Sequence, residues 1–498
     1  MTRTADRCWS LVVLLLAAGC AQPSPTIAPP HDTRAARSLS SDLDNIFSAP
    51  VMEQGLWGVE VKSLDTGAVL YALNARKLMM PASNMKILTL AAAAETLGWD
   101  YRFKTVLERS APVENGALEG DLVVVGTGDP TINSRGNRAS SVFDEWAAAL
   151  KTAGIHRIDG AIIGDDDQFD DVRLGQGWAW DNLEYGYAAP VGALEYNEDV
   201  AVLSIQPGAK PGDPAGLAIT AGTGLTIVNR MVTAPPKSQT AIDFDRRPYG
   251  AVLVVKGSIA SDAQPALRDV AVVNPTVYFV QALKDALIAR GIAVSGDAVD
   301  VHDHPYATPK EGFPAFATSL SPPLRDIATV MMKVSQNLYA ETLLKAVGAA
   351  KNGRGTADAG RSAARDIFQM WGIAPGGYVQ MDGSGLSRYD YVTAEMVVTI
   401  LEHMYRDPRH HEAFVATLPI AGKDGTIASR MKNTRAEGNA LAKTGSIANV
   451  RALSGYVRTR DGQTVAFSML ANSFTIPAAT VNWIADLAVE TLSNYTSR

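Results

Sequence analysis

The sequence predicts an α+β fold in which one domain is assembled from the two ends of the chain and is interrupted by inserted β-rich modules. Three observations support this prediction. Strand-like apolar runs lie near both ends of the chain, and helical patterns lie between them. The stretch from about 103 to 295 breaks into short strand-like runs separated by Gly and Pro, which favours β-rich modules over helices.

The first expected elements are a β-hairpin and a buried helix. Residues 57–64 and 68–73 alternate around the turn-forming tripeptide 65–67. Residues 83–97 are apolar on most sides and stop at Gly98, as expected for a buried helix with a glycine cap. The other expected strands are 121–125, 160–164, 201–205, 251–256, 451–458 and 464–471, and the other expected helices are 277–290, 323–348, 358–371, 394–406 and 478–492.

The composition is that of a globular protein and excludes several functions. The chain has 498 residues, of which 47% are hydrophobic and 19% charged. This length suggests about three domains with real cores. Lys and Arg number 45 against 52 Asp and Glu, and no run is rich in Lys or Arg. We therefore expect no nucleic-acid partner.

The first twenty residues have the layout of an export signal. Arg3 and Arg7 precede an apolar run over 9–18 that is too short to span a bilayer. The run closes at Cys20 as Leu-Ala-Ala-Gly-Cys, which resembles the bacterial lipoprotein box. An ordinary signal peptide cut near Ala21 is the alternative. We predict an exported protein of the cell envelope or periplasm, with a signal peptide over 1–20 and membrane contact through a lipid on Cys20.

The next segment is expected to be a flexible tether. Residues 21–42 contain four prolines among Ser, Thr and Ala and show no periodicity. The chain has two cysteines, and Cys8 would leave with the signal peptide. No intramolecular disulfide can then form, so the cores must stabilise the exported protein.

Ser83 and Lys86 lie three residues apart at the start of the expected buried helix and therefore on one face. A serine hydroxyl needs an adjacent base to act as a nucleophile, and a lysine can serve once burial lowers its pKa. The spacing alone is weak evidence, because Ser429 and Lys432 share it. That second copy lacks a following apolar run, so we interpret it as a capped helix with a solvated lysine.

Two further motifs strengthen the interpretation. Ser335-Gln336-Asn337 places small polar residues within an otherwise apolar helical pattern, and Lys443-Thr444-Gly445-Ser446 lies before an apolar strand. Ser-x-x-Lys, Ser-x-Asn and Lys-Thr-Gly in this order form the signature of class A β-lactamases and penicillin-binding proteins.

These residues can carry out acyl transfer at a serine. Ser83 would attack a carbonyl, Lys86 would take its proton, and Ser335 would relay a proton to the departing amine. Asn337 would hold the substrate amide, and Lys443 would pair with a substrate carboxylate.

The rest of the last motif would complete the substrate site. The backbone N–H groups of Ser83 and Ser446 would form the oxyanion hole. The hydroxyls of Thr444 and Ser446 would join the carboxylate site, and Gly445 would let the strand approach the substrate backbone. No cofactor or metal is expected.

The spacing of the motifs identifies a family. Ser83 and Ser335 are 252 positions apart, far more than in a compact β-lactamase. The arrangement resembles the class C low-molecular-mass penicillin-binding proteins, the D-alanyl-D-alanine carboxypeptidase/endopeptidase family. Further resemblance lies in 120–130, 337–341, 382–387 and 421–426.

The resemblance implies a fold, a domain plan and a substrate. A β-lactamase-like transpeptidase domain would comprise 43–102 and 293–498, with inserted domain II over 103–125 and 205–292 and inserted domain III over 126–204. The substrates would be peptidoglycan stem peptides, and β-lactams would inhibit by acylating Ser83. In similar proteins an acidic residue of the inserted region binds the amino end of the peptide side chain. Asp165 is the candidate for that role, and a capped surface turn is an equal alternative.

Two rival functions remain open at this stage. A β-lactamase would share acylation and differ in deacylation, although the large insertion argues against it. A catalytically silent peptidoglycan-binding protein of the same fold would have no need for Lys86 beside Ser83. The sequence does not give the balance between carboxypeptidase and endopeptidase activity, or the oligomeric state.

His302 and His304 lack an evident third metal ligand, and the aromatic cluster 178–187 is interpreted as a packed loop.

Overall fold

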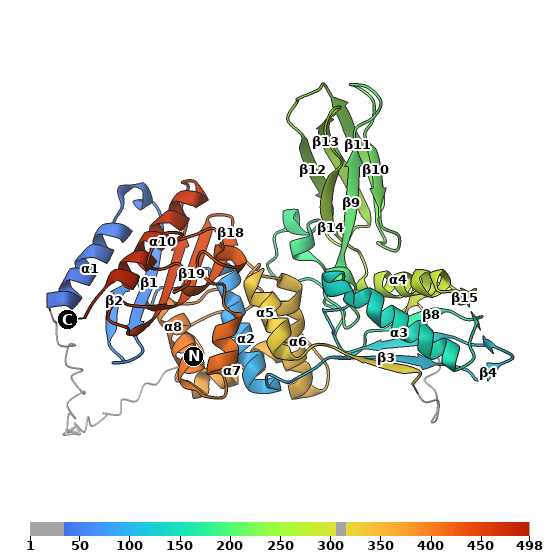
Figure 1. Cartoon of the computed structure of the whole chain (residues 1–498), viewed down its shortest axis with the longest axis horizontal. Coiled ribbons are helices and arrows are strands. Elements are labelled where there is room, and N and C mark those ends of the chain that lie inside the picture. The colour runs from blue at the N-terminus through green and yellow to red at the C-terminus, as the bar shows by residue number, and fades with distance from the viewer. Residues whose placement is uncertain (1–33, 305–314, 498) are drawn as a thin grey trace, which may run out of the picture.

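The computed structural model describes residues 34–304 and 315–497 of the chain. It contains a main body with a central sheet and a helical bundle, an α/β insert beside the bundle, and a β module that projects from the junction of the other two (Figure 1). Among the described residues, no helix is both long and apolar enough to cross a membrane.

The central sheet brings the two ends of the chain together. Its five strands are antiparallel in the order β18-β19-β20-β1-β2, so the first strand of the chain pairs with the last. Along β20, Phe467 and Met469 face one core, whereas Ala466 and Leu470 face the other. Both faces of the sheet are thus buried, which explains its near-continuous apolar strands. The strands are β1 (Leu56–Ser63), β2 (Val69–Leu73), β18 (Leu441–Ile447), β19 (Val450–Arg458) and β20 (Thr464–Asn472).

Helices cover the two faces of this sheet. The helices α1 (Arg34–Phe47) and α10 (Ala478–Asn494) pack on one face, and α8 (Ala394–Arg406) packs on the other (Figure 1). The bundle on the α8 side is built around α2 (Met85–Leu97), whose Ala, Leu and Ile side chains are buried on nearly every side. The remaining helices of the bundle are α5 (Leu324–Lys333), α6 (Asn337–Asn352), α7 (Ala357–Met370) and α9 (His411–Thr417).

The α/β insert contains two small sheets and two helices. Its larger sheet has the order β16-β8-β6-β3-β17, and the smaller sheet has the order β15-β7-β5-β4. Helices α3 (Arg138–Thr152) and α4 (Pro275–Ala289) share one apolar core with these sheets. The strands are β3 (Lys104–Arg109), β4 (Val113–Glu114), β5 (Ala117–Leu118), β6 (Leu122–Gly126), β7 (Arg157–Ile158), β8 (Ile162–Asp165), β15 (Ala293–Val294), β16 (Ala298–Asp300) and β17 (Ala317–Leu320).

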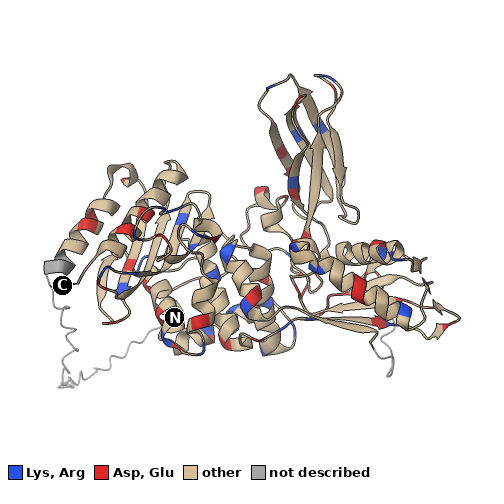
Figure 2. Ribbon diagram, viewed as in Figure 1, with Lys and Arg blue, Asp and Glu red and all other residues tan. Residues whose placement is uncertain are grey.

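The β module has a core of its own between two three-stranded sheets, with the orders β10-β9-β14 and β11-β13-β12. Acidic and basic residues are interspersed over this module and over the rest of the ribbon (Figure 2). The strands are β9 (Val200–Gln206), β10 (Gly216–Ile219), β11 (Thr226–Ala234), β12 (Ala241–Arg246), β13 (Val252–Ala260) and β14 (Ala266–Ala271).

The strand pairing divides the inserted region differently from the predicted domain boundaries. Strand β8, from the segment 126–204 assigned to domain III, pairs with β6, which ends at the predicted boundary. Strand β16, from the segment assigned to the catalytic domain, pairs with β8 in turn. The nested body is therefore the β module over 200–271. Parallel pairing between distant strands leaves no local mark in the sequence, which is why the boundaries were misplaced.

Several elements differ from the sequence-based expectation. Helix α3 lies in a region predicted to be β-rich, although Val142, Trp146 and Leu150 follow a helical period. Helix α1 replaces the predicted tether from residue 34 onward, because Leu39 and Leu43 are buried against the sheet. The expected helix over 323–348 is two helices. The predicted signal peptide, Cys20 and residues 21–33 lie outside the described residues.

Candidate active site

The Ser83 hydroxyl and the Lys86 amine lie side by side at the start of α2. Ser83 belongs to the 3₁₀ turn over 82–84 that leads into the helix, and Lys86 lies one turn later. The two side chains are 3.0 Å apart, from Oγ to Nζ. The predicted pairing of these two residues is therefore present in the structure, within hydrogen-bond distance for proton transfer.

Lys86 is completely buried, and this burial decides its protonation. Desolvation lowers the pKa of Lys86 from its ordinary value of 10.5 to about 7, and the carboxylates of Asp382, Glu341 and Asp390 oppose the shift. At neutral pH a substantial fraction of Lys86 is thus a neutral amine. A neutral amine can accept the proton of Ser83, which an ordinary lysine ammonium cannot do.

Lys86 is also held by two acceptors away from Ser83. Its Nζ donates to Oδ1 of Asn337 at 2.6 Å and to the carbonyl oxygen of Ser384 at 2.8 Å. The other end of the Asn337 amide donates to the carbonyl of Tyr187 at 2.7 Å. Asn337 therefore has an oriented amide, linked to the base on one side and to the insert on the other.

Ser335 lies at a break between two helices. Helix α5 ends at Lys333 and α6 begins at Asn337, and Ser335 has a φ of +62°. A left-handed conformation costs energy for a residue with a Cβ, and such strain is concentrated at functional sites. The break turns Ser335 and Asn337 toward Ser83, which a continuous helix would not do.

The last motif runs along β18, the edge strand of the central sheet. Lys443 is buried, and its Nζ lies 2.8 Å from Oγ of Ser335. Burial and the neighbouring Lys86 lower the pKa of Lys443 well below its ordinary value. The Thr444 hydroxyl donates to the Thr426 hydroxyl at 2.7 Å, which brings the 421–426 segment to the same edge.

Gly445 allows β18 to lie against the start of the helix that carries Ser83. A Cβ at this position would lie 2.5 Å from the carbonyl oxygen of Pro81 and 3.2 Å from the Cβ of Ala82. In addition, Asn84 donates from its side chain to the carbonyl of Lys443 at 3.0 Å. The strand and the helix start are thus fixed directly against each other.

A loop over 382–387 holds Lys86 through the carbonyl of Ser384, a role that the sequence did not reveal. Glu341, on α6, accepts hydrogen bonds from the backbone N–H groups of Gly383 and Ser384 at 2.9 and 2.8 Å. Asp382 accepts from the N–H of Gly385 at 2.7 Å and from the Trp178 indole at 2.9 Å. The buried acidic residues thereby position the Ser384 carbonyl that holds Lys86.

These residues open into a cavity of about 460 Å³, which we call the acyl cavity. Its charged lining consists of Asp181 and Arg388, neither of which was predicted from the sequence. Asp165 does not line this cavity and lies at the end of β8 in the α/β insert. The cavity is lined by Ser83, Ala179, Asp181, Asn182, Tyr187, Ser335, Asn337, Gly385, Leu386, Arg388, Thr426, Thr444, Ser446, Ile447 and Ala448.

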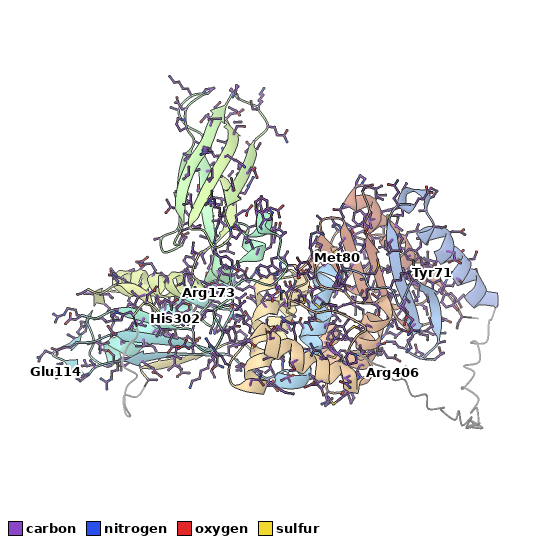
Figure 3. All side chains as sticks on the ribbon, turned by 180° about the vertical axis from the view of Figure 1, so that it is seen from behind. Tyr71, Met80, Glu114, Arg173, His302 and Arg406 are labelled. Atoms are coloured by element: carbon purple, nitrogen blue, oxygen red, sulfur yellow. The ribbon has the colours of Figure 1, made fainter. Side chains whose placement is uncertain are left out.

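Two other sequence features lie away from this cavity. Ser429 and Lys432 are exposed, as expected for a solvated lysine, but they lie in turns and not in the capped helix that the sequence predicted. His302 contacts Asp300 at 2.9 Å, and Arg173 donates to the same carboxylate at 2.9 Å. Arg173 and His302 lie near each other on the insert (Figure 3). Although Asp166, Asp300 and His302 are close enough to share a metal ion, the arginine already neutralises the carboxylate pair, so we interpret the group as an ion-pair network.

A buried amine beside a serine hydroxyl, a second serine and lysine in contact, and an edge strand along the cavity define a serine acyl-transfer enzyme of the penicillin-recognising fold. The comparison with known families identifies it further. The chain belongs to the D-Ala-D-Ala carboxypeptidase 3 (S13) family, whose model matches residues 39–492. The family and the fold class predicted from the motifs are confirmed.

Individual relatives are similar along most of their length. The D-alanyl-D-alanine carboxypeptidase of Actinomadura sp. strain R39 is 35% identical over 468 residues, which cover 91% of this chain and 84% of that protein. The D-alanyl-D-alanine carboxypeptidase DacB of Haemophilus influenzae is 29% identical, with 84% and 85% coverage. The crystal structure of penicillin binding protein 4 from H. influenzae matches with a TM-score of 0.79 at 28% identity, covering 91% of this chain and 99% of that chain.

Proposed function

We propose that this protein is a serine D-alanyl-D-alanine carboxypeptidase and D,D-endopeptidase of peptidoglycan stem peptides, with Ser83 as the nucleophile. The contact between Ser83 Oγ and the Nζ of the buried Lys86 carries the proposal, because it joins a weak nucleophile to a base that is partly neutral at pH 7. The S13 family and its carboxypeptidase members support the same activity.

Acylation follows from this contact. Ser83 Oγ bonds to the carbonyl carbon of the penultimate D-alanine while its proton passes to Lys86. The C–N bond then breaks, and the amine leaves with a proton from Ser335. Lys443, 2.8 Å from the Ser335 oxygen, stabilises and reprotonates that hydroxyl. Lys86 then loses to solvent the proton that it took from Ser83, and Lys443 regains one, which restores the neutral base. Water attacks the ester while Lys86 takes its proton, and this proton passes to the Ser83 oxygen as the C–O bond breaks and the shortened peptide leaves.

The backbone and β18 hold the reacting groups. The N–H groups of Ser83 and Ser446 form the oxyanion hole, and each such donor contributes about 3 kcal/mol to transition-state stabilisation. Lys443, Thr444 and Ser446 bind the carboxylate that follows the scissile bond. Gly445 lets the substrate approach the strand. These roles agree with the positions of Thr444 and Ser446 in the lining of the acyl cavity, with the contact of Lys443 to Ser335, and with the close approach of Gly445 to Pro81.

The acidic residue that binds the amino end of the peptide side chain is Asp181 rather than Asp165. Asp181 lines the acyl cavity, whereas Asp165 lies on the insert and accepts a hydrogen bond from the N–H of Asp167. Arg388 lines the same cavity and supplies the opposite charge. Together they suit a side chain that carries both an amine and a carboxylate.

β-Lactams are expected to acylate Ser83 by the same route, because their strained amide occupies the position of the scissile bond. The penicillin binding protein 4 of H. influenzae, 27% identical with a TM-score of 0.73, has been crystallised in complex with a β-lactam. A persistent acyl-enzyme separates this function from that of a β-lactamase, which would return the hydrolysed drug.

We further propose that the protein is exported to the cell envelope and anchored by a lipid on Cys20. The basic and apolar layout of residues 1–20 supports this assignment. Fractionation of cells expressing the wild type and Cys20→Ala tests it. The wild type should be recovered with membranes and the variant without them, and equal recovery of both with membranes would contradict the anchor.

The activity is tested by D-alanine release from a stem pentapeptide ending in D-alanyl-D-alanine. The wild type should release D-alanine, and Ser83→Ala should reduce the rate by at least about a thousandfold. Ser429→Ala is the matched control, because it removes the serine of the second Ser-x-x-Lys spacing on the exposed surface. Undiminished release by Ser83→Ala would contradict the proposal.

A further inference from the structure

One wall of the acyl cavity is a loop over 178–188, which we call the cavity loop. It has two 3₁₀ turns, 180–182 and 186–188, and lies apart from the elements that carry the three motifs. Turns this short do not hold a fixed position by themselves. The position of the loop must therefore come from what packs against it. The residues of the loop that line the cavity are Ala179, Asp181, Asn182 and Tyr187.

The cavity loop is connected to the base of the reaction through one carbonyl group. The Tyr187 carbonyl accepts from Nδ2 of Asn337 at 2.7 Å, and Oδ1 of the same amide accepts from Nζ of Lys86 at 2.6 Å. Because the side-chain amide is planar, the position of the Tyr187 carbonyl sets the direction of the oxygen that faces Lys86. A displaced loop would therefore disturb the pair formed by Lys86 and Ser83.

The β module holds the cavity loop at Glu184 and Tyr185. The backbone of Tyr185 forms a β-bridge with Val270 on β14, and the N–H of Ala271 donates to the Glu184 carbonyl at 3.0 Å. The Tyr185 ring packs against the core of the β module, with its centroid 5.8 Å from that of Phe244 on β12. Both the backbone and the side chain of this short segment are thus attached to the β module.

The cavity loop also lies close against the β module. A Cβ at Gly186 would lie 3.0 Å from Cγ2 of Val200 and 3.3 Å from Cβ of Asp269. The Tyr185 ring stacks on the Tyr187 ring, with centroids 5.5 Å apart and planes at 6°. Close packing of this kind transmits a displacement instead of absorbing it. Tyr185 therefore joins the core of the β module to the residue whose carbonyl reaches the active site.

On the main body, the contacts of the cavity loop are apolar. Leu183 and Ala188 form a small buried cluster with Leu386, and Ile447 at the end of β18 packs against this cluster. A segment with few buried apolar contacts has low local stability. The backbone pairing and ring stacking at Tyr185 are therefore expected to supply much of the order of the loop.

We propose that the β module positions the active site, with Tyr185 as a positioning residue that acts through the Tyr187 carbonyl on Asn337. The inference rests on the proposed function and gives the β module a part in acylation that requires no contact with the substrate. Tyr185 itself does not line the acyl cavity. Misplacement of reacting groups by about 1 Å can slow an enzyme by about a hundredfold, so a small shift of the loop is sufficient.

Intact-mass time courses with benzylpenicillin test the proposal, because they separate the rate of acylation from its final extent. A preparation that is partly misfolded labels to a lower extent, and its folded fraction keeps the wild-type rate. A protein with a misplaced active site labels completely but slowly. Tyr185→Ala should lower the second-order rate constant about tenfold and reach the same final extent as the wild type.

Three further variants accompany Tyr185→Ala. Tyr185→Phe should keep the wild-type rate, because it retains the ring and loses only the hydroxyl. Gly186→Val places a side chain between the loop and the β module and should also label slowly and completely. Met231→Ala is the control for stability, because Met231 is buried in the same core, on β11, and does not line the acyl cavity. It should lower the unfolding temperature and keep the acylation rate within about twofold.

A double variant tests the route through Asn337. In an Asn337→Ala background, Tyr185→Ala should change the acylation rate by less than about twofold, because the amide that Tyr185 positions is already absent. Independent effects would multiply instead, and the full loss caused by Tyr185→Ala would appear again.

The outcomes that overturn the inference are distinct from failure of the proposed function. Wild-type rates in both Tyr185→Ala and Gly186→Val would overturn it, as would a Tyr185→Phe protein as slow as Tyr185→Ala. Equal slowing by Met231→Ala would reduce the effect to stability, and a full loss in the Asn337→Ala background would remove the proposed route. A wild type that gains no adduct would instead contradict the proposed function on which the inference rests.

Discussion

The Nζ of Lys443 lies 2.8 Å from the Oγ of Ser335, which joins the motif of the edge strand to the motif of the helix break. Lys86 makes the corresponding contact with Ser83 at 3.0 Å. Two serine–lysine pairs therefore lie next to each other, one placed for the attacking oxygen and one for the departing amine. The buried Lys86 also lowers the pKa of Lys443, so the two pairs are electrostatically coupled.

The pH dependence of acylation should follow the protonation of Lys86. Because the neutral amine is the base and burial lowers its pKa to about 7, kcat/KM should fall about tenfold per pH unit below that value and level off above it. The measurement is the pH profile of kcat/KM for acylation by a chromogenic β-lactam. A profile that keeps rising toward the ordinary lysine pKa of 10.5 would show that Lys86 is not the base.

Glu341 provides a check on the sign of this effect. Its charge raises the pKa of Lys86, so Glu341→Gln should move the acid limb of the profile to lower pH. Burial raises the pKa of Glu341 itself to about 7, which keeps part of its charge present in the relevant range. A limb that moves to higher pH would contradict this electrostatic account.

Removal of the Lys443 amine should impair turnover more than folding. Lys443→Ala deletes the amine that contacts Ser335, and loss of one such catalytic hydrogen-bonding group lowers kcat/KM by about a hundredfold. Lys432→Ala, an exposed lysine outside the site, is the control. Steady-state kinetics on the pentapeptide measure both variants. Equal activity of Lys443→Ala and the control would show that the contact has no role in the reaction.

Because β18 lies close to the nucleophile, adding a single methyl group at Gly445 should destabilise the fold. Gly445→Ala places a Cβ 2.5 Å from the Pro81 carbonyl, which requires the strand to shift and costs about 1–3 kcal/mol of folding free energy. The acylation rate should fall with it. Gly376→Ala is the control, because a Cβ there meets no atom within 4 Å. Denaturant unfolding compares the two, and equal stabilities would disprove the close contact.

The first helix should be part of the folded body rather than a linker. Leu43 of α1 is fully buried against the central sheet. Leu43→Ala should therefore lower the free energy of unfolding by about 2–5 kcal/mol. Leu267→Ala, at an exposed position on β14, should cost much less. Thermal unfolding of both variants measures the difference. If the Leu43→Ala protein is as stable as the control, this segment behaves as the flexible tether that the sequence predicted.

The sequence predicted the site better than the architecture around it. The three motifs carry their chemistry in residue types and spacing. In the structure Ser83, Ser335 and Asn337 line one cavity, and the buried Lys86 and Lys443 contact them. Residues that support Lys86 without touching it form no recognisable motif in the sequence. Glu341 and Asp382 support Lys86 through backbone hydrogen bonds that depend on how α6 and the 382–387 loop pack.

The errors of sequence reasoning share a physical cause. Asp165 was the candidate because a run of acidic residues is visible in the sequence. Asp181 was not considered, because the path of the loop that brings it to the cavity leaves no mark in the sequence. The break at Ser335 was missed because apolar residues keep a helical period on both sides of it. The domain boundaries depended on pairing of β6, β8 and β16, which only the folded chain defines.

The central claim is that Ser83 forms the acyl-enzyme, and an intact-mass time course with benzylpenicillin tests it most directly. The wild type should gain the mass of one drug molecule and keep it, and Ser83→Ala should gain nothing while Ser429→Ala behaves as the wild type. An adduct of the same size on Ser83→Ala, or no adduct on the wild type while the drug stays intact, would contradict the claim.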